Sequence, residues 1–206
     1  MLLVFVLAAL APVAPAPPTF DHDSYRQTAY YQDARLPRYG PNVLEVALEE
    51  ESFWAFYGRR FAADDGYAGL GFLGSDEDEQ VINARFLRYG KPVGDPPFAL
   101  GVGLGVYAAE AEVPDKQSFA VALMGSIETR FDSGYPVRLV LEGAYAPDVS
   151  TFGDGDQVVD LWARVELELS DIAQFFVGYR VVELQFDDGT ERDLGESVQV
   201  GVRLGF

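Results

Sequence analysis

The stretch Ser197-Val-Gln-Val-Gly-Val-Arg-Leu-Gly-Phe206 alternates in polarity with a period of two residues. Successive side chains of a β-strand point to opposite faces, so one face of this stretch is wholly apolar and the other is polar or small. The apolar face carries Val198, Val200, Val202, Leu204 and Phe206. The stretch therefore predicts a strand that has one face in an apolar environment and ends on an aromatic residue.

Similar segments fill the chain from residue 43 onward. Most have about nine to eleven residues or slightly more, the length of a tilted strand that crosses a bilayer. Turn-forming residues separate them, and every second connection is mostly longer and rich in Asp, Glu and Gly, as in barrels with short periplasmic turns and longer external loops. The predicted strands cover residues 43–49, 53–61, 67–75, 79–90, 98–109, 117–131, 136–146, 157–169, 174–186 and 196–206.

We therefore expect an all-β fold, a closed antiparallel up-and-down transmembrane β-barrel of about ten strands. Segments 53–61 and 79–90 alternate poorly, and if one early hairpin lies outside the sheet the barrel has eight strands. In segment 174–186 the apolar parity changes near Val181 and Val182. This change predicts a β-bulge or an exit from the membrane.

The composition of the polar faces separates a membrane barrel from a soluble one. A soluble barrel buries its apolar face, whereas a membrane barrel turns that face to lipid. Here the polar faces mix charges with many Gly and Ala residues, as a crowded lumen would. The alternatives are a β-sandwich and a soluble periplasmic barrel that binds an apolar ligand. Aromatic residues are predicted at both interfaces: Phe98, Phe131, Phe175 and Phe206 at the periplasmic rim, and Phe119 and Tyr145 at the outer rim.

Composition narrows the class of protein. The chain of 206 residues has a net charge of −18, which excludes nucleic acid as a partner because phosphate groups would be repelled. It has no Cys, so neither a disulfide nor a thiolate metal site can form. Residues 1–16 are predicted to be a signal peptide, residues 17–42 an N-terminal arm and residues 43–206 the barrel. No stretch has the length and hydrophobicity of a transmembrane helix.

Charged residues on the polar faces are expected to point into the lumen. Barrels of about eight to ten strands are largely filled by side chains, and charges in so narrow a space must pair to offset their desolvation. We expect an ion-pair network that stabilises and plugs the barrel; the alternative is a narrow, gated polar path for ions or small solutes. The predicted lumen charges are Glu45, Glu49, Arg85, Glu128, Arg130, Arg138, Glu142, Asp160, Arg164, Glu166, Glu168, Arg180 and Arg203.

The sequence offers little for catalysis. The only histidine, His22, falls in the N-terminal arm and is interpreted as a solvated linker residue, so the barrel has no histidine to act as a general base. Glu166 and Glu168 are paired carboxylates of the kind that glycosidases use, but neighbouring positions on one strand face in a charge-rich lumen are a weak signal. We predict no enzymatic activity, no catalytic residues and no cofactor.

Two predicted outer loops are acidic, Ser75–Glu79 and Asp148–Asp156. Oxygen-rich clusters bind Ca²⁺ or Mg²⁺, so divalent cations that bridge these loops to lipopolysaccharide phosphates are a predicted partner. The spacing does not match an EF-hand, and solvated loops are the simpler interpretation. A binding module that uses these loops for cations or a surface partner is a second functional hypothesis.

The last strand also predicts an assembly signal. Outer-membrane barrels commonly end in an alternating strand with a C-terminal Phe, which the barrel assembly machinery captures by pairing with the strand edge. Val198, Val200, Val202, Leu204 and Phe206 match this pattern. The expected partners are therefore outer-membrane lipid and, during biogenesis, the assembly machinery.

Several short glycine-aromatic motifs resemble those of a known family. They are Tyr57-Gly-Arg-Arg60, Ala99-Leu-Gly-Val-Gly-Leu-Gly-Val-Tyr107, Glu142-Gly-Ala-Tyr-Ala-Pro-Asp148, Val177-Gly-Tyr-Arg180 and Val200-Gly-Val-Arg-Leu-Gly-Phe206. Together with a Glu-rich first strand, they make residues 43–206 similar to the YfaZ-type outer-membrane proteins of Gram-negative bacteria. The resemblance implies a barrel of the cell outer membrane with unassigned activity and no catalytic or ligand residues to carry over. We expect a small barrel that is structural, or narrow and porin-like with a charge-plugged lumen.

Overall fold

The computed structural model describes residues 41–206 except 51, 62–65, 76–78, 95, 112–115, 134, 171 and 190. The predicted signal peptide and nearly all of the predicted N-terminal arm lie outside these residues. Within the described ranges, no helix is long or apolar enough to cross a membrane. The single helical element described is a 3₁₀ turn, η1 (Asp148–Ser150), and the rest of the regular structure is β.

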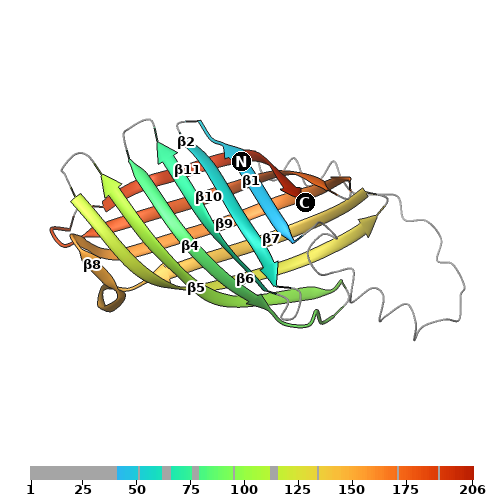
Figure 1. Cartoon of the computed structure of the whole chain (residues 1–206), viewed down its shortest axis with the longest axis horizontal. Coiled ribbons are helices and arrows are strands. Elements are labelled where there is room, and N and C mark those ends of the chain that lie inside the picture. The colour runs from blue at the N-terminus through green and yellow to red at the C-terminus, as the bar shows by residue number, and fades with distance from the viewer. Residues whose placement is uncertain are drawn as a thin grey trace, which may run out of the picture.

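The strands follow one another around a barrel (Figure 1). They are β1 (Asn42–Leu48), β2 (Ser52–Phe61), β3 (Gly66–Ser75), β4 (Gln80–Tyr89), β5 (Phe98–Ala111), β6 (Lys116–Ser133), β7 (Tyr135–Ala146), β8 (Thr151–Gly153), β9 (Gly155–Ser170), β10 (Ala173–Phe186) and β11 (Glu191–Gly205).

Strand pairing closes the sheet on itself. Each strand of the wall is antiparallel to the next, in the order β1 to β7 followed by β9, β10 and β11, and β11 pairs back with β1. Reciprocal backbone hydrogen bonds of 3.0 Å join Asn42 and Phe206 at the seam. The short β8 pairs with β6 beyond the end of β7. The prediction of a closed ten-stranded barrel is confirmed, and the alternative of eight strands is wrong because β2, β3 and β4 are all part of the wall.

The two ends of the barrel differ. We call the end at which Asn42 meets Phe206 the terminal end, and the opposite end, where residues 187–190 join β10 to β11, the loop end. The strand predicted over residues 196–206 was too short, because β11 already begins at Glu191.

The sequence of β10 suggested a change of parity that the strand does not have. Its even-numbered residues from Gln174 to Phe186 are all buried in the lumen, so its parity does not change along the strand. The predicted irregularity near Val182 is real, but the extra residue lies on the partner: Val182 pairs with Gly195, and Glu183 pairs with Asp193. Leu184 and Phe186 therefore face inward as apolar residues.

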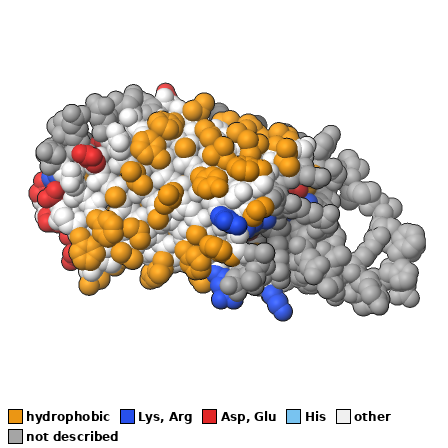
Figure 2. All heavy atoms as spheres, in the orientation of Figure 1, with side chains coloured by type: hydrophobic (Ala, Val, Ile, Leu, Met, Phe, Trp, Pro, Cys, Tyr) orange, Lys and Arg blue, Asp and Glu red, His pale blue; other side chains and the backbone are white. Residues whose placement is uncertain are grey.

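The apolar face of the wall points outward. Val198, Val200, Val202, Leu204 and Phe206 are all exposed on the barrel's outer surface, between 39% and 59%. The same holds for the predicted interfacial aromatics, of which Phe98, Phe131, Phe119 and Tyr145 are exposed and Phe175 is half-buried. Figure 2 shows hydrophobic side chains covering the visible wall. The β-sandwich is excluded by closure, and the soluble-barrel alternative required the reverse arrangement of the two faces.

Candidate functional site

The lumen collects the side chains that alternate with this apolar outer face. Of the predicted lumen charges, Glu45, Arg85, Glu128, Arg138, Glu142, Asp160, Arg164, Glu166 and Arg180 are at most 8% exposed. Glu49, Arg130, Glu168 and Arg203 face the same interior and are half-buried. The sequence set holds seven carboxylates and six guanidinium groups, and Arg60, which lines the lumen cavity, brings the second number to seven. Arg60 and Glu79, which is 6% exposed, were not in the predicted set.

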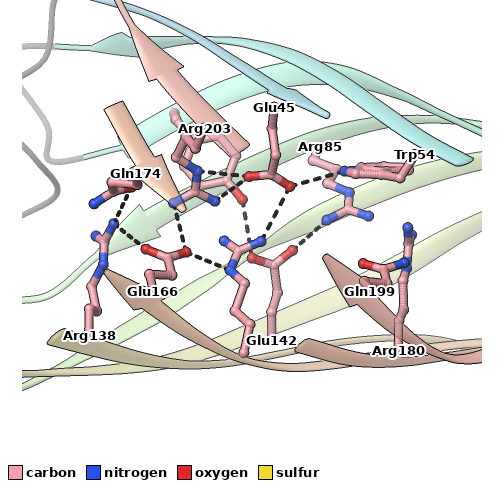
Figure 3. Close-up of polar contacts among 12 residues, drawn as sticks. Glu45, Trp54, Arg85, Arg138, Glu142, Glu166, Gln174, Arg180, Gln199 and Arg203 are labelled. Carbon is pink, nitrogen blue, oxygen red and sulfur yellow. Dashed lines mark hydrogen bonds and ion pairs between the residues drawn. The ribbon is translucent and has the colours of Figure 1, made fainter. Parts of the chain in front are cut away.

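A first cluster is built on Glu45 and Glu166 (Figure 3). Glu45 accepts from Arg203, with Nε at 2.7 Å and Nη2 at 2.5 Å, and from Arg164 at 3.3 Å. Glu166 contacts Arg138 at 2.5 Å, Arg164 at 2.7 Å and Arg203 at 3.1 Å. Because Arg164 and Arg203 contact both carboxylates, ion pairs join β1, β9 and β11 across the lumen.

A second cluster is centred on Asp160. Arg180 donates from Nε and Nη2 to Asp160, both at 2.9 Å, which is a bidentate contact. Arg85 contacts Asp160 at 3.1 Å and Glu142 at 2.6 Å, and the Tyr107 hydroxyl donates to Asp160 at 3.0 Å. This cluster ties β4, β5, β7, β9 and β10 together.

Two tryptophans lie between the clusters. The indole of Trp54 donates to Glu45 at 3.0 Å, and its ring contacts that of Trp162 edge-on with centroids 6.1 Å apart. The guanidinium of Arg180 lies 4.1 Å from the Trp54 centroid, and that of Arg164 lies 4.1 Å from the Trp162 centroid. Cation–π contacts of this kind are stronger where water is excluded. The charged and aromatic side chains therefore form one packed unit.

Inward glycines provide room for these rings. A Cβ added at Gly71 would lie 2.1 Å from the Trp54 ring, and one added at Gly201 would lie 2.3 Å from the Phe176 ring. Real Cβ atoms do not approach other atoms so closely, so any side chain at these positions would displace the ring. The glycines that the sequence places on the polar faces thus act as sockets for aromatic side chains of neighbouring strands.

The remaining predicted charges lie toward the two ends. Arg138 reaches Glu128 at 3.5 Å and donates to Gln174 at 3.0 Å, and Arg130 pairs with Glu168 at 3.1 Å. Near the loop end, Glu49 accepts hydrogen bonds from Ser197 and Gln199 of β11.

Toward the loop end the lumen becomes apolar. Leu73, Val81, Val158, Leu184 and Phe186 are each no more than 2% exposed and belong to one core cluster. The strand sequences did not predict this layer, since residues of this type were assigned to the outer face. This apolar layer fills the section of the lumen that the charged clusters do not occupy.

A small cavity remains toward the terminal end. Its volume is about 30 Å³, counted as the space that the centres of water molecules can occupy, and its lining includes Arg60, Tyr67, Tyr89 and Glu128. Since one water needs about 10–15 Å³ by this measure, the cavity holds about two water molecules.

Residues that the sequence analysis missed are mostly aromatic. Trp54 and Phe56 point inward from β2, whose outer face carries Phe53, Tyr57 and Phe61, so both faces of this strand are apolar. Because both faces are apolar, polarity does not alternate clearly along this segment of the sequence. The small residues of β3 could have indicated the inward rings of β2, because an aromatic ring inside a narrow barrel needs a glycine opposite it.

The histidine and the acidic loops singled out in the sequence fall only in part on described residues. His22 lies outside the described residues. Within the described part of the chain, no group of three or more His, Cys, Asp or Glu residues could hold a metal ion. Of the predicted acidic loops, Asp76, Glu77 and Asp78 also lie outside the described residues. Asp154, in the other loop, accepts from the Gln117 backbone amide at 3.1 Å.

Comparison with protein-family models identifies the family of this chain. The family model described as YfaZ precursor matches residues 59–206. The chain belongs to the YfaZ precursor family. The match includes every strand from β3 to β11 and most of the charged lumen, while β1 and most of β2 precede it. Among curated proteins and among solved structures, no match to this chain is found.

Proposed function

We propose that this member of the YfaZ precursor family is an integral barrel of the bacterial outer membrane, non-enzymatic, with a lumen closed by ion pairs and aromatic rings. One observation carries the proposal: the wall is apolar on its outside and charged on its inside. That arrangement suits lipid outside and paired charges within. In water the exposed apolar belt would be far larger than soluble monomers tolerate.

The packed lumen supports a structural role more strongly than transport. The two charged clusters, the tryptophan pair and the apolar layer occupy the barrel from one end toward the other, and the cavity that remains holds about two waters. A narrow porin-like path would require the clusters to rearrange. On this proposal the last strand, whose residues Val198, Val200, Val202 and Leu204 face outward, is the segment that the assembly machinery recognises.

A second candidate is a binding module at the loop end. Exposed carboxylates gather there, among them Glu110, Asp148, Asp187 and Glu196, and Figure 2 shows acidic side chains at that end. Part of this charge is engaged within the chain, because Lys116 contacts Asp188 at 2.5 Å. A basic surface partner fits this end better than a single bound cation does.

Membrane insertion is tested by electrophoresis and fractionation. Barrels that face lipid resist SDS until boiled, so unheated and boiled samples of protein folded into vesicles should migrate differently, and the native protein should fractionate with outer membranes. Identical migration, or recovery in the soluble fraction, would remove the proposal.

The closed lumen is tested by planar-bilayer recordings. We expect no discrete conductance steps from the wild-type barrel at moderate voltage. Steady, cation-selective steps would instead establish the porin-like alternative.

A further inference from the structure

The connection between β7 and β9 is a well-ordered turn at the loop end of the barrel. It comprises residues 147–153, which include η1 and β8. The Pro147 carbonyl accepts hydrogen bonds from the Ser150 amide at 2.8 Å and from the hydroxyls of Ser150 and Thr151, both at 3.1 Å. β8 then pairs with β6, and Figure 1 shows the turn beside β8 protruding from the wall. The conformation of the turn is therefore fixed by contacts within the chain.

This turn holds two large apolar side chains away from the rest of the chain. Val149 is 85% exposed, more than any other large hydrophobic residue that the structure describes, and Phe152 is 56% exposed. Thr151 is buried, because it alternates with Phe152 on β8 and faces inward. Single exposed apolar residues are common on proteins, whereas a contiguous exposed apolar patch marks a contact with lipid or protein.

Phe152 continues the apolar outer face of the barrel. It pairs with Phe119 of β6, and the two ring centroids are 6.3 Å apart. Val121 and Leu123 follow on the same outward face of β6 and are also exposed. The turn thus extends, without a break, the surface that is proposed above to face lipid. Because of this continuity, lipid is the partner that fits the turn best.

The level of Phe152 along the barrel axis matches the edge of the apolar face. Ala108 of β5 pairs with Phe119, so Ala108, Phe119 and Phe152 form one row across three strands, and two residues after Ala108 the face of β5 turns polar at Glu110. Since strands lie about 4.8 Å apart and tilt by about 40°, Phe152 differs in height from Ala108 by about 6 Å. The interfacial region of each leaflet is about 5–8 Å thick, and aromatic residues are enriched there.

We propose that the turn 147–153 is a membrane anchor, in which Val149 and Phe152 insert among the lipids of the leaflet at the loop end. Their contact is with the acyl chains next to the glycerol groups, so it does not depend on a particular headgroup. The exposed carboxylates of Asp148 and Asp154 flank the two side chains and stay in the hydrated headgroup layer. The sequence predicted that residues 148–156 face the medium, whereas on this proposal the turn lies against the bilayer. The anchor rests on the membrane location proposed above.

Spin labels test the anchor, because the chain has no Cys and an introduced cysteine carries the only label. The full chain is folded into phosphatidylcholine vesicles as V149C, F152C, V200C or D187C, each with a nitroxide on its cysteine. V200C reports the lipid-facing wall, since Val200 faces outward on β11, and D187C reports the exposed turn between β10 and β11. Power-saturation electron paramagnetic resonance measures how often each label collides with oxygen, which concentrates in bilayers, and with a water-soluble nickel chelate.

V149C and F152C should collide with the nickel chelate severalfold less often than D187C does, and with oxygen severalfold more often. Nickel collision rates equal to that of D187C would overturn the anchor, and so would protection from both reagents, which indicates contact with protein.

V200C separates the anchor from the membrane location. If V200C is shielded from nickel while V149C and F152C are not, the anchor fails and the membrane barrel stands, whereas nickel access at V200C removes both. Heat-modifiable migration shows that each labelled variant is folded, and V149C gives the reading by itself if Phe152 is needed for folding.

Discussion

Replacing Glu166 by Gln should destabilise the barrel more than any other single carboxylate-to-amide change in the lumen. Glu166 is fully buried and contacts three guanidinium groups, at 2.5, 2.7 and 3.1 Å. Glutamine keeps the size of the side chain but removes the charge. Arg164 and Arg203 then share Glu45 alone, and Arg138 keeps only Glu128 at 3.5 Å as a charged partner, beside the Gln174 amide oxygen at 3.0 Å.

The expected loss follows from the cost of leaving buried charge without its partner. Removing one member of a buried ion pair typically lowers the free energy of unfolding by about 3–5 kcal/mol. Glu166 is 0% exposed. Glu168 provides the control, since it is on the same strand, two residues away, but half-buried and paired with Arg130 at 3.1 Å. The side chains of this pair are 22% and 16% exposed, so water screens it more than the contacts of Glu166, and E168Q should cost clearly less than E166Q.

Tryptophan emission gives the assay. The chain has two tryptophans, both inside the lumen, and the Arg164 guanidinium lies 4.1 Å from the Trp162 ring. Protein folded into vesicles is titrated with denaturant in both directions, and the free energy of unfolding is obtained for the wild type, E166Q, E168Q, R164Q and E166Q/R164Q. Removing a positive charge together with Glu166 should restore the balance, so the double variant should lose less than the sum of its single variants.

Two results would refute this reasoning. If E166Q were no more destabilising than E168Q, Glu166 would not be holding the three arginines together. If E166Q and R164Q were additive, their contact at 2.7 Å would carry no coupling energy, and the lumen would be stabilised by packing alone.

The packing of the lumen leads to further predictions. G201A should cost about 1–3 kcal/mol, as overpacking usually does, because its Cβ would lie 2.3 Å from the Phe176 ring; G125A, with nothing within 4 Å of its Cβ, should be neutral in the same denaturant titration. W54A/W162A should turn the silent barrel into one with discrete conductance steps in planar bilayers, since both indoles stand between the charged clusters. Silence of that variant at unchanged heat-modifiability would show that the apolar layer closes the lumen by itself.

Which residues share a face was readable from the sequence. A strand has a period of two, so the outward set of β11 and the inward set of β9 follow from residue parity alone. Glu166 and Arg164 lie on one face of β9 for this reason, and their assignment to the lumen needed no structure. The same rule failed on β2 and at the end of β10, where both faces carry apolar residues and alternation gives no contrast.

The contacts inside the lumen were decided by tertiary structure. Arg164 meets Glu45 across 119 residues of sequence, and Arg85 meets Asp160 across 75. Which arginine reaches which carboxylate depends on the stagger of ten strands around the closed wall, and local sequence does not encode that stagger. The apolar layer near Phe186 and the sockets at Gly71 and Gly201 depend on it too, because a ring fits only where the closing sheet sets a glycine opposite it. Alternation of polarity is set by the sequence of one strand, whereas ion pairing across the lumen is set by the closure of all ten strands into a barrel.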